Sequence, residues 1–175
     1  MEQAIHTAAI WVLSGLVLGT WVYCVLQILA VRSYRAVKPP VPRDPNEPVS
    51  ILKPLHGVDE GLEGNLRTFF TQDHPQFEIL FAAREASDPC WDGVERLRQE
   101  FPDVKVRCFV TGEPPYPNAK VFSLSRMSRE AAHDLLIMSD SDIRVTPGLA
   151  ATLAAEFQDD ALGVATCPYR AVPAA

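Results

Sequence analysis

The sequence predicts an α/β protein with a mostly parallel sheet, preceded by one transmembrane helix. Short β-branched or apolar segments alternate along the chain with segments whose apolar residues recur at helical spacing. One of the short segments, Asp134–Met138 (DLLIM), is apolar in the manner of parallel strands that are buried on both faces. Alternation of this kind is typical of parallel strands joined by right-handed helical crossovers.

The N-terminal segment concentrates the hydrophobic residues, which make up 47% of the 175 residues. Ala8–Val31 carries no formal charge and, at about 1.5 Å per residue, is long enough to cross a hydrocarbon core of about 30 Å. A cleaved signal peptide would instead have a basic start and a shorter apolar stretch. Glu2 precedes the apolar segment, and four basic residues follow the segment. Because the positive-inside rule places basic flanking residues in the cytoplasm, the C-terminal side is predicted to be cytoplasmic. The four basic residues are Arg32, Arg35, Lys38 and Arg43.

We therefore expect residues 1–33 to form a retained, single-pass signal anchor in a membrane. Residues 34–48 are predicted to be a stiff linker, because the dense prolines from Lys38 to Pro48 remove backbone donors and favour extended conformations. The globular body is expected to span residues 49–175 and to be held close to the bilayer.

The first half of this body contains two predicted strands and one predicted helix. Val49–Leu55 combines β-branched and apolar residues and ends before a turn, as a buried strand does. Apolar residues between positions 62 and 70 recur on one face of a helix. Phe77–Ala83 follows His74 and Pro75 and has the composition of a second strand.

The second half continues the alternation. Asp88 and Pro89 form an N-cap and first-turn pair for a helix running to about residue 100, and Val104–Val110 is a predicted third strand. Prolines and a glycine mark residues 111–120 as a loop. The remaining predicted elements are a helix over Val121–Ala132, a strand over Asp134–Met138, a helix from Thr146 and Pro147 to Phe157, and a strand over Gly163–Thr166.

Polar residues that directly follow strands are the candidates for chemistry, because ligands of open parallel sheets bind beyond the carboxyl ends of the strands. Asp140 and Asp142 follow the DLLIM strand one residue apart. Their oxygens suit Mg²⁺ or Mn²⁺, which also binds a substrate diphosphate. The alternative is a solvated turn stabilised by an aspartate side chain. Arg144, close behind, is either a phosphate partner or a surface charge.

Four further residues are candidate contacts to a nucleotide sugar. Glu85 and Asp88 follow the second strand, where a carboxylate can accept from a base N–H or a ribose hydroxyl, although Asp88 alone is better explained as a helix cap. Lys120 could reach a phosphate as a point charge or be an ordinary exposed lysine. Lys53 lies within an apolar strand, which implies either a structural ion pair or a role at the binding edge.

Composition and missing motifs exclude several functions. The formal net charge of −6 argues against a nucleic-acid binder, which needs a basic face. The chain has no Walker A loop, no GxGxxG and no GxSxG, so P-loop hydrolysis, dinucleotide redox chemistry and α/β-hydrolase chemistry are disfavoured. The cysteines form no CxxC pair, which argues against a zinc knuckle and a dense disulfide framework. They are Cys24, Cys90, Cys108 and Cys167.

Taken together, the motifs resemble lipid-directed inverting glycosyltransferases, specifically the ceramide glucosyltransferase family and its bacterial hopanoid-associated relatives. The resemblance rests on the order of VSILKPLHGVD, NLRTFFTQDHPQFEILFAAREASDP, NAKVFSLSR and DLLIMSDSDIRV after an apolar anchor. It implies an incomplete GT-A (Rossmann-like) domain that moves a sugar from a UDP-sugar donor to a hydroxyl of a membrane lipid acceptor. Ceramide-type relatives have Asp-Ser-Gly where this chain has Asp140-Ser141-Asp142, and Glu85 replaces a more usual aspartate.

By resemblance, Glu85 or Asp88 corresponds to the family's first acidic motif and Asp140 with Asp142 to the second, which holds diphosphate and metal. The general base and a (Q/R)xxRW segment are expected beyond residue 175. We therefore expect a fragment that binds a UDP-sugar with metal weakly and does not turn over. The alternatives are a non-catalytic nucleotide-sugar-binding membrane module and a nucleotidyltransferase. The latter would need no lipid anchor.

Overall fold

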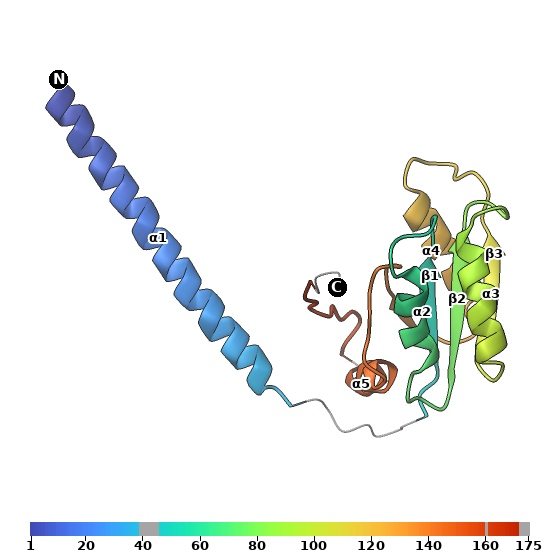
Figure 1. Ribbon diagram of the computed structural model, residues 1–175. Helices are drawn as coiled ribbons and strands as arrows, with labels where there is room; N and C mark the ends of the chain where they lie inside the picture. The colour runs from blue at the N-terminus through green and yellow to red at the C-terminus, as the bar shows by residue number, and fades with distance from the viewer. Residues whose placement is uncertain (39–45, 160, 172–175) are drawn as a thin grey trace. The chain divides into compact units, whose positions relative to one another are not determined.

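The computed structural model describes residues 1–38, 46–159 and 161–171. The chain divides into two compact units, Met1–Pro39 and Pro40–Ala175 (Figure 1). In chain order the elements are α1 (Glu2–Ala36), β1 (Val49–Pro54), α2 (Leu62–Phe70), β2 (Phe77–Ala83), α3 (Cys90–Glu100), β3 (Lys105–Val110), α4 (Ala119–Glu130), β4 (Leu135–Met138) and α5 (Leu149–Glu156).

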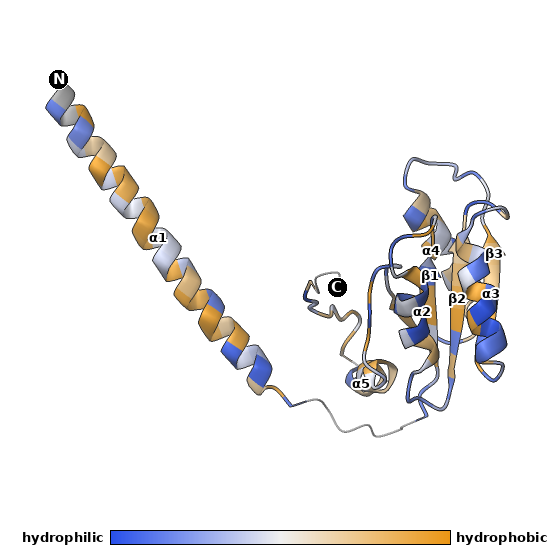
Figure 2. Ribbon diagram, viewed as in Figure 1, coloured by the Kyte–Doolittle hydropathy of each residue, from blue (hydrophilic) through white to orange (hydrophobic). Residues whose placement is uncertain are grey.

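The first unit is the single long helix α1, which is apolar along most of its length (Figure 2). By length and composition, Ile5–Ala36 is the one stretch of the described residues that could cross a membrane as a helix. The helix continues past the uncharged segment to Ala36, because nothing disrupts helical hydrogen bonding before the prolines that begin at Pro39. Most of the proline cluster predicted as a linker, residues 39–45, lies outside the described residues.

The second unit is built on a sheet in the order β3-β2-β1-β4, and every neighbouring pair is parallel. From β1 the chain moves outward through β2 to β3, and it then crosses back to place β4 on the other side of β1. The direction of winding therefore reverses between β1 and β4. In open α/β sheets this reversal leaves a crevice at the carboxyl ends of the two strands, where ligands bind.

Both faces of the sheet are covered by helices. On one face, Ile51, Ile79 and Phe81 pack in a large cluster with apolar residues of α2, α3 and α5. On the other face, Leu52 and neighbouring strand residues pack against Met127 of α4. The alternation of strand residues between the two clusters follows from the two-residue period of a strand. Burial on both faces confirms the parallel α/β fold that the apolar strands predicted.

The predicted strand over Gly163–Thr166 is wrong, since the structure gives these residues no regular secondary structure. Val164 is 80% exposed, and a four-residue segment without a paired edge and a buried face does not hold a strand. Two helix starts also differ from expectation. Helix α4 begins at Ala119, because the Asn118 side chain accepts from the Val121 backbone N–H at 3.0 Å. Helix α5 begins only after Gly148.

Candidate functional site

The carboxyl ends of β1 and β4 meet in register at the point where the winding reverses. Leu52 lies opposite Met138, and the backbone N–H of Ser139 donates to the Leu52 carbonyl at 3.2 Å. Lys53 and the turn that begins at Ser139 are consequently neighbours across the two strand ends. The sequence placed Lys53 within one strand and the Ser139 turn after another, and the parallel pairing brings them together.

Lys53, near the carboxyl end of β1, is fully buried. Its Nζ donates to the backbone carbonyl of Asp140 and, at 3.3 Å, to Ser139 Oγ, and it lies 3.8 Å from the centroid of the Phe69 ring. Burial lowers the pKa of the Lys53 ammonium from 10.5 to about 7, against the opposing effect of the Asp140 and Asp142 carboxylates. Lys53 thus links the acidic turn to β1 through these hydrogen bonds, and its amine interacts electrostatically with the carboxylates of Asp140 and Asp142.

Asp140 and Asp142 are exposed, and Asp140 already holds a cationic group. The Nζ of Lys120, from the first turn of α4, lies 2.5 Å from Asp140 Oδ1. Among the described residues, no cluster of three or more histidine, cysteine or acidic side chains could hold a metal ion. Two carboxylates nevertheless fit Mg²⁺ or Mn²⁺ that a nucleotide accompanies, because such ions keep waters and substrate phosphates as their other ligands.

The two acidic residues after β2 have different surroundings. Asp88 accepts from the backbone N–H of Cys90 at 2.9 Å and of Gly57 at 3.0 and 3.1 Å, and His56 Nδ1 lies 3.7 Å away. Burial alone raises the pKa of the Asp88 carboxyl, but these hydrogen bonds outweigh it and hold the pKa below its ordinary value. Asp88 therefore holds the first residue of α3, just before the N-cap residue Pro89, and closes the loop after β1. The Glu85 side chain, in contrast, is exposed.

The sequence of the chain matches a known protein family and curated relatives. The model of the family described as Glycosyl transferase family 21 matches residues 9–175. The chain belongs to glycosyl transferase family 21. It is 33% identical over 136 residues to ceramide glucosyltransferase 1 of Caenorhabditis elegans, covering 77% of this chain and 29% of the worm protein. The chain thus spans less than a third of the length of that relative, and the family resemblance expected from the motifs is confirmed.

Solved structures support the GT-A fold of this family 21 chain. The mannosyltransferase PcManGT from Pyrobaculum calidifontis, solved with GDP-Man and Mn²⁺, has a TM-score of 0.64 and 18% identity, covering 83% of this chain and 43% of that one. Staphylococcus aureus TarS 1–349 with UDP-GlcNAc has a TM-score of 0.50 and 20% identity, covering 65% of this chain and 31% of that one. At these identities the likeness concerns the fold alone, and the predicted GT-A-like α/β fold is confirmed.

Arg144 in the family 21 chain is placed against α2. Its Nε donates to Asn65 Oδ1 at 2.7 Å, and Asn65 is buried. Gly61, which precedes α2, adopts a φ of 78° that side chains disfavour, and a Cβ there would lie 3.5 Å from the Arg144 guanidinium. Arg144 therefore joins the segment after the acidic turn to the start of α2, a role that the sequence did not suggest.

A polar stripe, made of Asn65 and Thr68 of α2 and of Gln72 just after the helix, continues this attachment and was missed in the sequence. Thr68 Oγ1 accepts from the Val145 backbone N–H at 3.2 Å. The Gln72 side chain donates to the Thr146 carbonyl at 3.0 Å and accepts from the Ala150 N–H at 3.0 Å. Asn65, Thr68 and Gln72 follow one another at intervals of three and four residues, and this helical spacing of polar side chains was the available signal.

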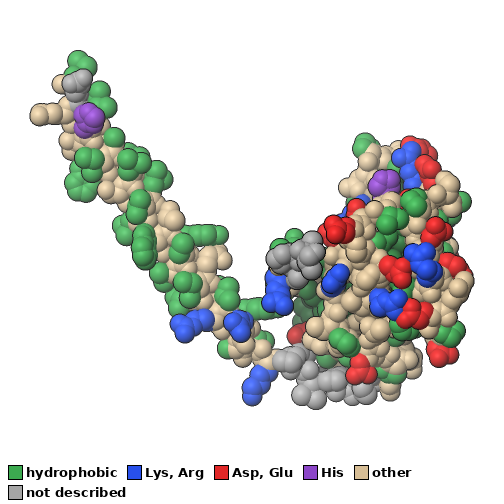
Figure 3. Space-filling model, in the orientation of Figure 1, with side chains coloured by type: hydrophobic (Ala, Val, Ile, Leu, Met, Phe, Trp, Pro, Cys, Tyr) green, Lys and Arg blue, Asp and Glu red, His purple; other side chains and the backbone are tan. Residues whose placement is uncertain are grey.

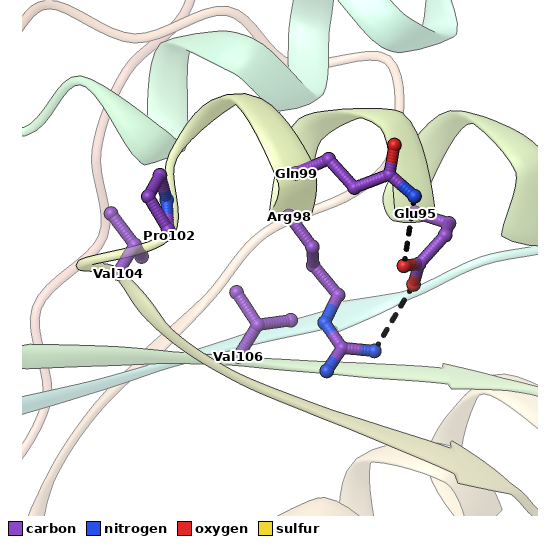
Figure 4. Close-up of a pocket in the computed structure, with 6 residues that line it drawn as sticks. All are labelled: Glu95, Arg98, Gln99, Pro102, Val104 and Val106. Carbon is purple, nitrogen blue, oxygen red and sulfur yellow. Dashed lines mark hydrogen bonds and ion pairs between the residues drawn. The ribbon is translucent and has the colours of Figure 1, made fainter.

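Two cavities of the second unit lie away from the acidic turn. One, of about 280 Å³, is formed where α3 ends and β3 begins (Figure 4). Its charged side chains are already paired, with Arg98 and Gln99 donating to Glu95 at 3.2 and 3.3 Å. Another, of about 370 Å³, is lined by residues that precede the strands, including Gln76, Lys105 and His133. Neither includes a predicted site residue, and both lie toward the amino ends of strands, opposite the expected ligand edge.

Proposed function

We propose that this chain forms the donor-binding part of a membrane-anchored glycosyltransferase that moves a sugar from a UDP-sugar to the hydroxyl of a ceramide- or hopanoid-like lipid. The observation that carries the proposal is a cluster of charged side chains at the paired carboxyl ends of β1 and β4. Its members are Lys53, Lys120, Asp140 and Asp142. Anionic and cationic groups at one such crevice match a ligand that consists of a diphosphate and a divalent cation. Family membership and the ceramide glucosyltransferase relatives support the choice of reaction.

In this proposal Asp140 and Asp142 would hold Mg²⁺ or Mn²⁺. Such an ion neutralises the charge that develops on a departing nucleoside diphosphate. The solved mannosyltransferase with a similar fold contains Mn²⁺, which supports the use of a divalent cation. Lys120 is close enough to the same carboxylate to meet the phosphates of a donor, and a lysine does this as a point charge.

The other predicted binding residues divide by their surroundings. We assign Glu85 to the nucleoside, because its exposed carboxylate follows β2, beside the crevice strand β1. Asp88 and Arg144 act on the site indirectly. The Asp88 oxygens hold the Gly57 loop and the start of α3, and Arg144 holds Asn65 of α2. Lys53 positions the acidic turn through the Asp140 carbonyl.

We further propose that α1 anchors the chain in a bilayer, single-pass, with the second unit in the cytoplasm. The length and apolar composition of Ile5–Ala36 support a membrane span. Figure 3 shows the first unit lined by hydrophobic side chains, with basic ones toward its C-terminal end. Arg32, Arg35 and Lys38 supply this positive charge, which predicts a cytoplasmic C-terminal side.

The test of donor binding is a calorimetric titration in which UDP is added to the full chain in detergent micelles, with and without Mn²⁺. UDP binding should require Mn²⁺, and Asp140→Ala and Asp142→Ala should each weaken it by about tenfold or more, as loss of metal-site groups commonly does. Asp103→Ala, which removes an exposed carboxylate before β3 at the opposite end of the sheet, should bind UDP as the wild type does. UDP binding that does not depend on Mn²⁺, or that neither Asp140→Ala nor Asp142→Ala weakens, would contradict the proposal.

A further inference from the structure

The ion pair between Lys120 and Asp140 occupies a group that the proposed function assigns to a metal. Lys120 Nζ lies 2.5 Å from Asp140 Oδ1, and both side chains are 53% exposed. Water competes with such a pair, and exposed pairs of this kind contribute little to stability. The contact can therefore open without disturbing the fold, because the Lys120 ammonium lies at the end of a long flexible side chain.

Lys53 differs from Lys120 in being fixed. Its fully buried amine is bonded to the Asp140 backbone carbonyl and Ser139 Oγ, so it does not contact the carboxylate oxygen that Lys120 holds. The Lys120 ammonium group offsets the charge of the Asp140 carboxylate. A divalent cation that approaches alone thus meets less negative charge and must displace this ammonium group.

We propose that Lys120 serves as a resident cation on Asp140 in the ligand-free protein and is exchanged for a divalent cation when a nucleotide diphosphate binds. The inference rests on the proposed function and adds an order of events to it. The incoming diphosphate brings the negative charge that the ligand-free site lacks. Lys120, released from Asp140, then has a phosphate to neutralise, so the exchange leaves no charge unpaired. The consequence is that the site takes up cation together with nucleotide and binds the cation alone weakly.

The experiment measures Mn²⁺ binding directly, by the electron paramagnetic resonance signal of unbound Mn²⁺, on the full chain in detergent micelles. Wild type, Lys120→Gln and Lys105→Gln are titrated without nucleotide and then with saturating UDP. Lys105 is the matched control, since it is an exposed lysine at the amino end of β3. Without UDP, Lys120→Gln should bind Mn²⁺ about 1.5-fold to fivefold more tightly than wild type, the range for a partly exposed charge pair. Lys105→Gln should not differ from wild type.

With UDP the advantage of Lys120→Gln should vanish or reverse, because the lysine then contributes to holding the phosphates. The gain in Mn²⁺ affinity without UDP should also depend on the Asp140 carboxylate, so it should be absent when Lys120→Gln is combined with Asp140→Asn. A gain that persists in this double variant, or no gain in Lys120→Gln, overturns the exchange.

The outcomes separate the exchange from the proposed function. If wild type binds UDP with Mn²⁺ while Lys120→Gln gains no affinity for Mn²⁺ alone, the exchange fails and the proposed function stands. If wild type binds no UDP at any Mn²⁺ concentration, the proposed function fails, whereas an Asp140-dependent gain in Lys120→Gln still supports displacement of the lysine by the cation.

Discussion

Asp88 illustrates how a single carboxylate can serve structure at the edge where ligands are expected. Its side chain is 8% exposed, and its oxygens accept from Cys90 and from Gly57, which has a φ of 64°. One residue thus starts α3 and fixes the turn after β1. The Asp-Pro pair in the sequence predicted a helix start here, although the N-cap position is Pro89, one residue later than expected. The bond to Gly57 depends on a chain segment 31 residues away.

We expect Asp88→Asn to lower the free energy of unfolding at pH 7 by about 1–2 kcal/mol, because a charged acceptor of backbone N–H groups is lost. The pKa of Asp88 is lowered in the folded state, so its contribution is present above its ordinary pKa of 3.8 and is lost as the pH falls through and below that value. The difference between wild type and variant should therefore shrink in acid. Urea unfolding of the full chain in detergent micelles at several pH values measures it.

The control for this substitution is Asp92→Asn, which changes an exposed aspartate in the first turn of the same helix. Its effect should stay within a few tenths of a kcal/mol, the size of a helix-dipole contribution. An equal loss in the two variants, or a difference that grows in acid, would contradict the role assigned to Asp88.

At the scale of elements, α2 does more than cover one face of the sheet. Its apolar side packs in the large core cluster through Leu66 and Phe69. The polar stripe, which begins on α2 and ends at Gln72 just after it, holds the segment from Arg144 to Ala150, which follows the acidic turn. The apolar spacing predicted the helix. The polar stripe could not be assigned a partner from sequence, because that partner follows more than 70 residues later.

Gln72→Met should destabilise this attachment while keeping the length of the side chain. The substitution leaves the Ala150 N–H and the Thr146 carbonyl without their side-chain partner. Ala150 is buried, and an unmade bond at a buried group costs about 1–3 kcal/mol. Hydrogen exchange followed by mass spectrometry should show faster exchange in α5 and the segment before it. Gln99→Met, on the exposed side of α3, should leave this exchange unchanged. Unaltered protection in Gln72→Met would show that Gln72 does not hold the segment.

At the scale of the whole molecule, the division into an apolar helix and an α/β unit predicts membrane residence and orientation. The chain should remain with membranes after alkaline carbonate extraction, as a spanning helix requires. In intact bacterial cells, a membrane-impermeant maleimide should label Cys167, which is exposed in the second unit, only after lysis. A Gln3→Cys variant should be labelled without lysis. The reverse labelling pattern would contradict the orientation predicted from the basic residues after the helix.

The sequence alone determined the elements and their class, because helix and strand periodicity and burial on both faces of a strand are local properties. It therefore predicted β2 with its observed bounds, the parallel sheet and the family. It failed for Gly163–Thr166, where a strand composition has no partner edge in the described structure. Strand formation at that position depends on pairing, which is not local.

Only the tertiary structure decided which candidate residues meet. The order β3-β2-β1-β4 brings Lys53 of β1 to the turn after β4, across a separation of 87 residues. The tertiary structure also gives the two acidic residues after β2 different surroundings. The Asp88 oxygens accept from backbone N–H groups, whereas Glu85 remains exposed. Side-chain partners are set by strand order and register, and these follow from the packing of the whole unit, so no local pattern of residues contains them.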